Sequence, residues 1–239
     1  MDNTPSVIEE TDDFAVIYKP PKMHCAVLKK EANDHKEVTL HEWYSRRGSG
    51  YCDLLHRLDF ETHGLVLFAR NKKSFEFFKN LQEKGGFIKE YSAVSEKSFK
   101  TPEGFPSPPE YEIFTPSVNN PVIIASYFRP YGQGRKLVRP AVEYKKNRDI
   151  ARDNGGFYRT EIINVNGGNF KARIKRGFRH QIRCHLCWIG FPILNDPLYS
   201  NSAAEGQFLA LRAHSLIFTN PSNGGMREYS IPALEKIPF

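Results

Sequence analysis

The chain has 239 residues and carries 34 Lys and Arg against 27 Asp and Glu, which gives a net charge of +7 at pH 7 and a pI near 9.2. This length buries a hydrophobic core without disulfide staples, and the positive charge favours a polyanionic partner. The N-terminus lacks the basic and apolar parts of a secretory signal, and no apolar run approaches the ~18 residues of a membrane span. We therefore expect a cytoplasmic protein that is not bound to a membrane.

Hydrophobic patterns in the first half of the chain predict alternating strands and helices. In order these are a strand, a short helix, a strand, a longer helix and a strand, at residues 14–18, 38–47, 65–69, 71–84 and 88–94. The longer helix is the best marked, because Asn71 can cap its start and Gly85 with Gly86 can end it. The last three elements predict a strand–helix–strand unit.

The second half begins with a connector, because residues 100–110 contain four prolines. Beyond it the patterns predict two strands, a buried helix and a last strand, at residues 158–165, 169–174, 180–190 and 207–219. The Asn-Gly-Gly sequence at 166–168 is a strong signal for a hairpin between the two strands.

The segment at 51–70 has the clearest chemical content. Its centre reads His56-Arg57-Leu58-Asp59, and an apolar run follows after Gly64. If residues 57–59 are extended, Arg57 and Asp59 lie on one face, beside the entrance of a buried strand. A carboxylate that is partly shielded from water yet kept ionised by positive charge suits a nucleophile. A surface ion pair before a strand is the other interpretation of these residues.

A basic stretch at 129–152 holds eight Lys or Arg, interleaved with Tyr131 and Tyr144. Cations can track phosphates while bases stack on the rings, so Arg135, Lys136 and Arg139 are candidates for nucleic-acid binding. A charged loop kept exposed for solubility is the alternative.

The predicted helix at 180–190 carries Arg183 near its start, beside the apolar stripe, where the side chain can reach a site at the N-terminal end. Cys184 and Cys187 flank His185 on the same helix. We expect no metal there, because structural zinc needs four ligands and the chain has no second Cys pair. Buried thiols on a core helix account for the pattern better.

Five motifs in this order resemble the RluA-type pseudouridine synthases. They are the strand end at 18–21, the segment from His56 to Leu65, the stretch 89–91, the helix start at 177–186 and the segment 190–199. The resemblance implies an α+β, mixed α/β catalytic domain around a mainly antiparallel central sheet flanked by helices. We expect this domain at 14–239, after a short tail at 1–13, with no metal or organic cofactor.

The resemblance also implies roles for single residues. Asp59 is the expected catalytic aspartate, Tyr91 the tyrosine that packs on the target base, and Arg183 the basic residue that pairs with Asp59. The expected partner is a structured RNA with a uridine in a loop or bulge, ribosomal or transfer RNA, and we expect a monomer. The expected RNA-binding residues are Arg57, His56, Lys89, Arg135, Lys136, Arg139, Arg179 and His180.

Two positions depart from the family pattern. His63 stands where the family usually has Ser, and Phe178 stands where it usually has Arg, which removes a donor near the site. These departures bear on substrate choice more than on chemistry.

Two other functions remain open at this stage. One is a catalytically inactive RNA-binding or assembly factor of the same fold. The other is a hydrolase that uses Asp59 with His56, His180 or His185, although no paired-carboxylate or metal-ligand spacing supports it.

Overall fold

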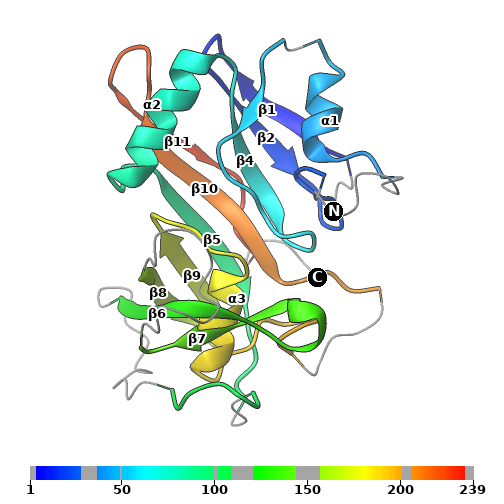
Figure 1. The fold of residues 1–239 in the computed structure, drawn as a ribbon, viewed down its shortest axis with the longest axis vertical. Helices are drawn as coiled ribbons and strands as arrows, with labels where there is room; N and C mark the ends of the chain where they lie inside the picture. The colour runs from blue at the N-terminus through cyan, green and yellow to red at the C-terminus, as the bar shows by residue number, and fades with distance from the viewer. Residues whose placement is uncertain are drawn as a thin grey trace. The chain divides into compact units, whose positions relative to one another are not determined.

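The computed structural model describes residues 4–27, 37–48, 50–98, 102–108, 121–143, 157–200 and 206–234. The chain divides into two units, which we call unit 1 (1–89 with 212–233) and unit 2 (90–211 with 234–239). Strands dominate both units, and nearly all the strand pairs are antiparallel, as the α+β prediction requires (Figure 1). No helix in the described part of the chain is both long enough and apolar enough to cross a membrane.

Unit 1 contains six strands and two helices within the described residues. They are β1 (Ser6–Glu10), β2 (Phe14–Lys19), α1 (Leu40–Ser45), β3 (Asp53–Leu54), β4 (His63–Ala69), α2 (Lys72–Glu83), β10 (Leu211–Thr219) and β11 (Met226–Ser230). The strands lie in the order β1-β2-β4-β10, with β3 paired to β4 and β11 paired to β10. The pairing of β4 with β10 is parallel and joins His63 to Arg212 and Gly64 to Ala213.

The two helices of unit 1 cover opposite faces of its strands, which is why β2 and β4 are buried along their whole length. On one face Phe78 of α2 packs edge-on against Phe14 and Phe218. On the other, Tyr44 of α1 packs against Phe68. Burial on both faces explains the continuous apolar runs that predicted these strands.

Side-chain caps fix both helix starts. The Asn71 Oδ1 atom accepts a hydrogen bond of 2.7 Å from the Ser74 backbone N–H, as the sequence predicts. Thr39 and Glu42 form a reciprocal capping box at the start of α1.

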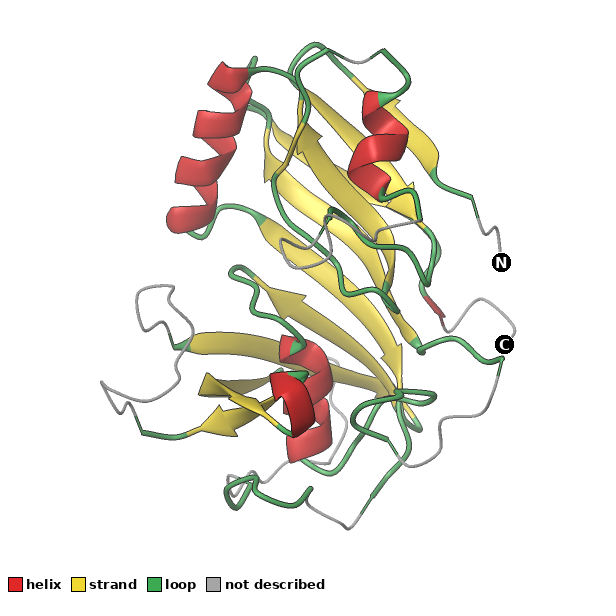
Figure 2. Ribbon diagram, turned by 45° about the vertical axis from the view of Figure 1, so that its right-hand side comes forward, coloured by secondary structure: helices red, strands yellow, loops and turns green. Residues whose placement is uncertain are grey.

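Unit 2 contains five strands, a 3₁₀ turn and one α-helix within the described residues. They are β5 (Ile88–Val94), β6 (Val122–Tyr131), η1 (Gln133–Arg135), β7 (Leu137–Ala141), β8 (Tyr158–Asn166), β9 (Asn169–Ile174) and α3 (Gln181–Trp188). The strand order is β5-β9-β8-β6-β7. Helix α3 packs against β7 and β8 (Figure 2), and every one of its residues is buried. The predicted hairpin at 166–168 and the predicted helix after His180 are both confirmed.

Several elements differ from the prediction. Strand β1 lies inside the expected tail at 1–13 and pairs with β2. Residues 129–141, which we weighed as a charged loop, form most of the β6–β7 hairpin. Residues 57–59 are not part of a strand; they lie in the loop between β3 and β4. Residues 144–152 of the basic stretch, including Tyr144, lie outside the described residues.

Candidate active site

Asp59 lies half-buried in the loop that enters β4. Its carbonyl oxygen accepts a hydrogen bond of 3.2 Å from the Thr62 N–H, which closes a turn around the carboxylate-bearing residue. The thiol of Cys25 brackets the preceding residue, because its sulfur accepts from the Leu58 N–H at 3.3 Å and donates to the Leu58 carbonyl at 3.5 Å. Burial raises the pKa of the Cys25 thiol, so the proton for the second bond stays in place. These contacts hold the Asp59 loop in one conformation.

Lys19 anchors the same loop through hydrogen bonds of its side chain. Its side chain is fully buried, and Nζ donates to the carbonyl oxygens of Pro20, Met23 and Phe60 at 2.8, 2.8 and 3.2 Å. Burial lowers the pKa of Lys19 to about 8, against the opposing charges of Cys25, Asp59 and Glu61. A buried cation therefore lies near the Asp59 carboxylate, and its hydrogen bond to the Phe60 carbonyl fixes the next residue of the loop.

His56 is half-buried and Lys89 is buried, and their predicted contact with RNA stays a prediction. The Nε2 atom of His56 accepts a hydrogen bond of 3.1 Å from the Leu67 N–H, and burial holds the pKa of this imidazole well below its usual range. Lys89 is only 4% exposed, and its ammonium lies 4.4 Å from the ring centroid of Phe87. Neither cation-forming group presents a charge at the surface, whereas Arg57 is exposed.

The expected tyrosine and arginine both lie in unit 2. Tyr91 is a buried residue of β5, 6% exposed. Arg183, in the first turn of α3, donates from Nε and Nη2 to the two carboxylate oxygens of Asp196 at 2.8 and 2.7 Å. The Asp196 carboxylate also accepts from the backbone N–H groups of Leu198 and Tyr199. Asp196 therefore fixes the plane of the Arg183 guanidinium, while the pairing of Arg183 with Asp59 stays a prediction.

Two of the histidines considered for a hydrolase, His180 and His185, lie in unit 2 and make other contacts there. His185 is fully buried, and its ring nitrogens bond the hydroxyls of Thr160 and Ser126 at 2.8 and 3.0 Å. Burial lowers the pKa of His185 to about 3, which makes it a structural group. The Nδ1 atom of His180 lies 3.2 Å from the Tyr199 hydroxyl.

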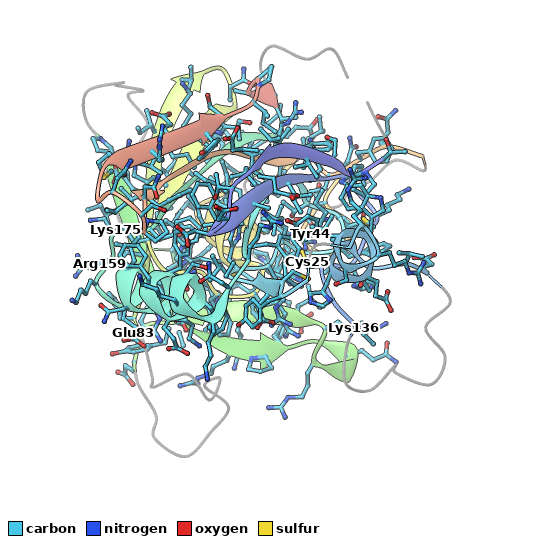
Figure 3. All side chains as sticks on the ribbon, turned by 90° about the horizontal axis from the view of Figure 1, so that it is seen from above. Cys25, Tyr44, Glu83, Lys136, Arg159 and Lys175 are labelled. Atoms are coloured by element: carbon cyan, nitrogen blue, oxygen red, sulfur yellow. The ribbon has the colours of Figure 1, made fainter. Side chains whose placement is uncertain are left out.

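The exposed positive charge of the β6–β7 hairpin sits at its tip. Arg135 and Lys136 are exposed there, and Figure 3 shows Lys136 well separated from Arg159 and Lys175 of the same unit. Arg139 has a different role: its guanidinium donates to the Gly104 carbonyl and lies 5.5 Å from the Tyr131 ring centroid. It ties the connector to the hairpin.

Phe178 stands where the family usually has Arg, and it and the following Arg179 have separate structural roles. Phe178 stacks on Phe128 with centroids 4.9 Å apart and an interplanar angle of 3°, so an aromatic core contact replaces the missing donor. Arg179 bonds the carbonyls of Arg135 and Leu137 at 2.9 and 3.3 Å and thereby supports the hairpin tip.

The family model for RNA pseudouridylate synthases matches residues 13–188. The chain belongs to this family. The resemblance to RluA-type enzymes is confirmed, because the chain is 28% identical over 177 residues to the dual-specificity RNA pseudouridine synthase RluA of Haemophilus influenzae, covering 73% of this chain and 70% of that protein.

Other relatives extend the match. An uncharacterised Caenorhabditis elegans protein is 30% identical over 200 residues, which are 84% of this chain but 40% of that protein. An uncharacterised RNA pseudouridine synthase of Helicobacter pylori is 27% identical over 213 residues, covering 89% of this chain and 70% of that protein. The solved structure of human RNA pseudouridylate synthase domain containing 1 has a TM-score of 0.67 at 19% identity and covers 96% of this chain and 84% of that one. It confirms the fold.

Proposed function

We propose that this pseudouridine synthase converts uridine to pseudouridine in structured ribosomal or transfer RNA, with Asp59 as the nucleophile. The observation that carries the proposal is the half-buried Asp59 on a loop anchored by buried Lys19. A carboxylate in such a place is partly shielded from water, while its backbone is held still by bonds on both sides of it.

The reaction needs few chemical groups. The N1–C1′ glycosidic bond breaks, the freed uracil turns, and a C5–C1′ bond forms while the proton on C5 is lost and N1 gains one, so nothing is oxidised or hydrolysed overall. The Asp59 carboxylate either adds covalently to the nucleotide or stabilises cationic character at the ribose as the first bond breaks. Both routes need an ionised carboxylate next to the sugar.

The detached base must be held while it turns. In this proposal the Tyr91 ring packs on the uracil, and its hydroxyl relays the C5 proton. Arg183, fixed in its plane by Asp196, supplies positive charge that pairs with Asp59. The dry, apolar surroundings of such a site prevent the loss of the base to solvent.

The positive charge of the chain and the names of its relatives both support an RNA substrate. The net charge of +7 and the exposed cations at the hairpin tip favour phosphate contacts. The H. pylori and H. influenzae relatives carry RNA pseudouridine synthase in their names. The target must leave its stack, at a cost that is lowest in loops and bulges, so we expect an accessible uridine in a folded RNA.

The test is to map pseudouridine across cellular RNA in cells with the gene, cells without it, and cells that carry Asp59→Asn. The proposal predicts one or more sites that disappear in the last two. If no site depends on the gene while the purified protein still binds RNA, an inactive RNA-binding factor describes the chain better.

A further inference from the structure

Arg212 is a buried cation beside the strand that follows the Asp59 loop. It is the second residue of β10 and lies directly opposite His63, the first residue of β4, in the parallel register. Its side chain is 9% exposed. Asp59 lies four residues before His63, so the two strands bring Arg212 to the end of unit 1 that also holds the candidate nucleophile.

The guanidinium has no hydrogen-bond acceptor among the described residues. Its Nε and Nη1 atoms are buried without a partner, and no carboxylate of the described chain forms a salt bridge with it. Its ring contact is with Tyr18, whose centroid lies 5.7 Å from the Arg212 Cζ. Nη2 is the one guanidinium nitrogen that is not among the buried atoms without a partner.

A charge in this situation costs folding free energy, because burial removes its water shell and no acceptor among the described residues replaces it. Burial lowers the pKa of the Arg212 guanidinium, and the Tyr18 hydroxyl offsets this only in part. The Tyr18 ring compensates this cost only in part, whereas an anion that arrives from outside would supply the missing acceptor.

Neither His63 nor Lys19, the groups beside Arg212 at the entrance of β4, neutralises its charge. His63 is fully buried, both of its ring nitrogens lack a partner among the described residues, and the charges of Arg212 and Lys19 act on it. Burial holds the pKa of His63 near 3, so its ring is neutral and contributes no negative charge. Two buried cations, Lys19 and Arg212, thus flank the entrance of β4, and Lys19 is already satisfied by three carbonyl groups.

We propose that Arg212 is a binding residue for a backbone phosphodiester of the substrate RNA, which its Nη2 edge receives at the entrance of β4. The inference rests on the proposed function and adds a contact that the sequence did not predict. The cation–π contact with Tyr18 fixes the plane of the guanidinium, so a phosphate bound there is held at a defined distance from the Asp59 loop. Such a contact positions the nucleotide without taking part in bond changes.

The experiment compares Arg212→Met, Arg212→Lys and the control Arg227→Met, which removes an exposed Arg of β11. The probe is a fluorescein-labelled 12-nucleotide single-stranded RNA with one uridine, and its affinity is measured over a salt series. Thermal unfolding is recorded for each variant. A competition arm with inorganic phosphate separates a general anion site from one that needs an RNA chain.

We expect Arg212→Met to weaken RNA binding by about tenfold at low salt and to reduce the salt slope by about 0.7, the value for one phosphate on a single strand. Its melting temperature should equal or exceed that of the wild type, because an uncompensated buried charge is removed. Arg212→Lys should keep the slope and lose part of the affinity, whereas Arg227→Met should change neither.

An unchanged affinity and slope in Arg212→Met would overturn the inference, as would a fall in melting temperature with unaltered RNA binding, since that combination marks a structural role. Release of the RNA by millimolar inorganic phosphate from wild type and Arg212→Met alike would also count against it. These measurements use binding alone, so they do not depend on turnover. A failure of the proposed function would instead appear as RNA binding without pseudouridine.

Discussion

Arg183 binds Asp196 through two parallel hydrogen bonds of 2.8 and 2.7 Å, and the two side chains are 2% and 0% exposed. We predict that Arg183→Ala lowers the free energy of unfolding by about 3–5 kcal/mol, because it leaves a carboxylate buried without its partner. Arg183→Ala combined with Asp196→Ala should lose less than the sum of the single changes. Chemical denaturation of the four proteins in a double-mutant cycle measures this coupling.

The matched control for this pair is Arg173, which bonds Glu90 at 2.7 Å but is 40% exposed. Arg173→Ala should cost about 1 kcal/mol or less, as is usual for surface pairs. Additive effects of Arg183→Ala and Asp196→Ala, within about 0.5 kcal/mol, would mean that the buried pair is not a unit.

Lys19 should make stability depend on pH in the alkaline range. Its pKa is about 8 in the folded chain against 10.5 for the ordinary side chain. Between these values the unfolded chain holds more protons, so stability increases with pH there and falls as pH drops through 8. Relative to Lys19→Met, the wild type should gain about 2 kcal/mol of unfolding free energy from pH 7 to pH 9.5. A constant difference between the two proteins across this range would show that the ammonium is not held in its buried site.

The basic residues of the β6–β7 hairpin should separate into two groups. Arg135→Gln with Lys136→Gln should weaken RNA binding and flatten its salt dependence without a change in stability, because both side chains are exposed. Arg139→Gln should lower the melting temperature instead, because Arg139 bonds the Gly104 carbonyl and packs over Tyr131. Salt titrations and thermal scans on the same variants distinguish the two. Equal salt slopes for the double variant and the wild type would show that the hairpin tip is a solvated turn that does not contact RNA.

The ring and the hydroxyl of Tyr91 should have separable roles. Tyr91→Phe keeps the buried ring on β5 and removes the hydroxyl, so RNA binding should persist while pseudouridine formation falls by 100-fold or more, on the order of a lost general-acid or base group. Binding and product formation are measured on the same RNA. Full activity in this variant would assign the proton step to another group.

The secondary structure was predictable wherever local chemistry decided it. The Asn71 cap, the Gly85–Gly86 stop and the Asn-Gly-Gly turn at 166–168 all act within a few residues, so their signals are complete in the sequence. Strand β1 lacked such a signal, because its half-polar residues gain their order only from pairing with β2. The first part of β6 is mostly apolar and was missed, whereas the rest of the β6–β7 hairpin was weighed as a charged loop because four Lys or Arg lie between residues 129 and 139.

The sequence motifs predicted the candidate site residues, but they did not predict the residues that hold them in place. Asp59 follows from its position before an apolar strand, but the bonds of Cys25 and Lys19 to its loop join residues more than 30 positions apart. The Asp196 partner of Arg183 is 13 residues away on an irregular segment, and no periodic pattern connects them. Arg212 looked like an ordinary strand residue, because only the register with His63 reveals that it is buried without an acceptor.

The proposed role of Asp59 as the nucleophile is tested by pseudouridine formation in vitro with Asp59→Asn. The RNA is total RNA from cells that lack the gene, and the readout is the pseudouridine content at sites that the wild type modifies. Because the substitution removes a charge and almost no volume, folding and RNA binding should stay close to wild type. We predict no detectable product under conditions in which the wild type completes the reaction, whereas turnover within tenfold of the wild type would contradict the account.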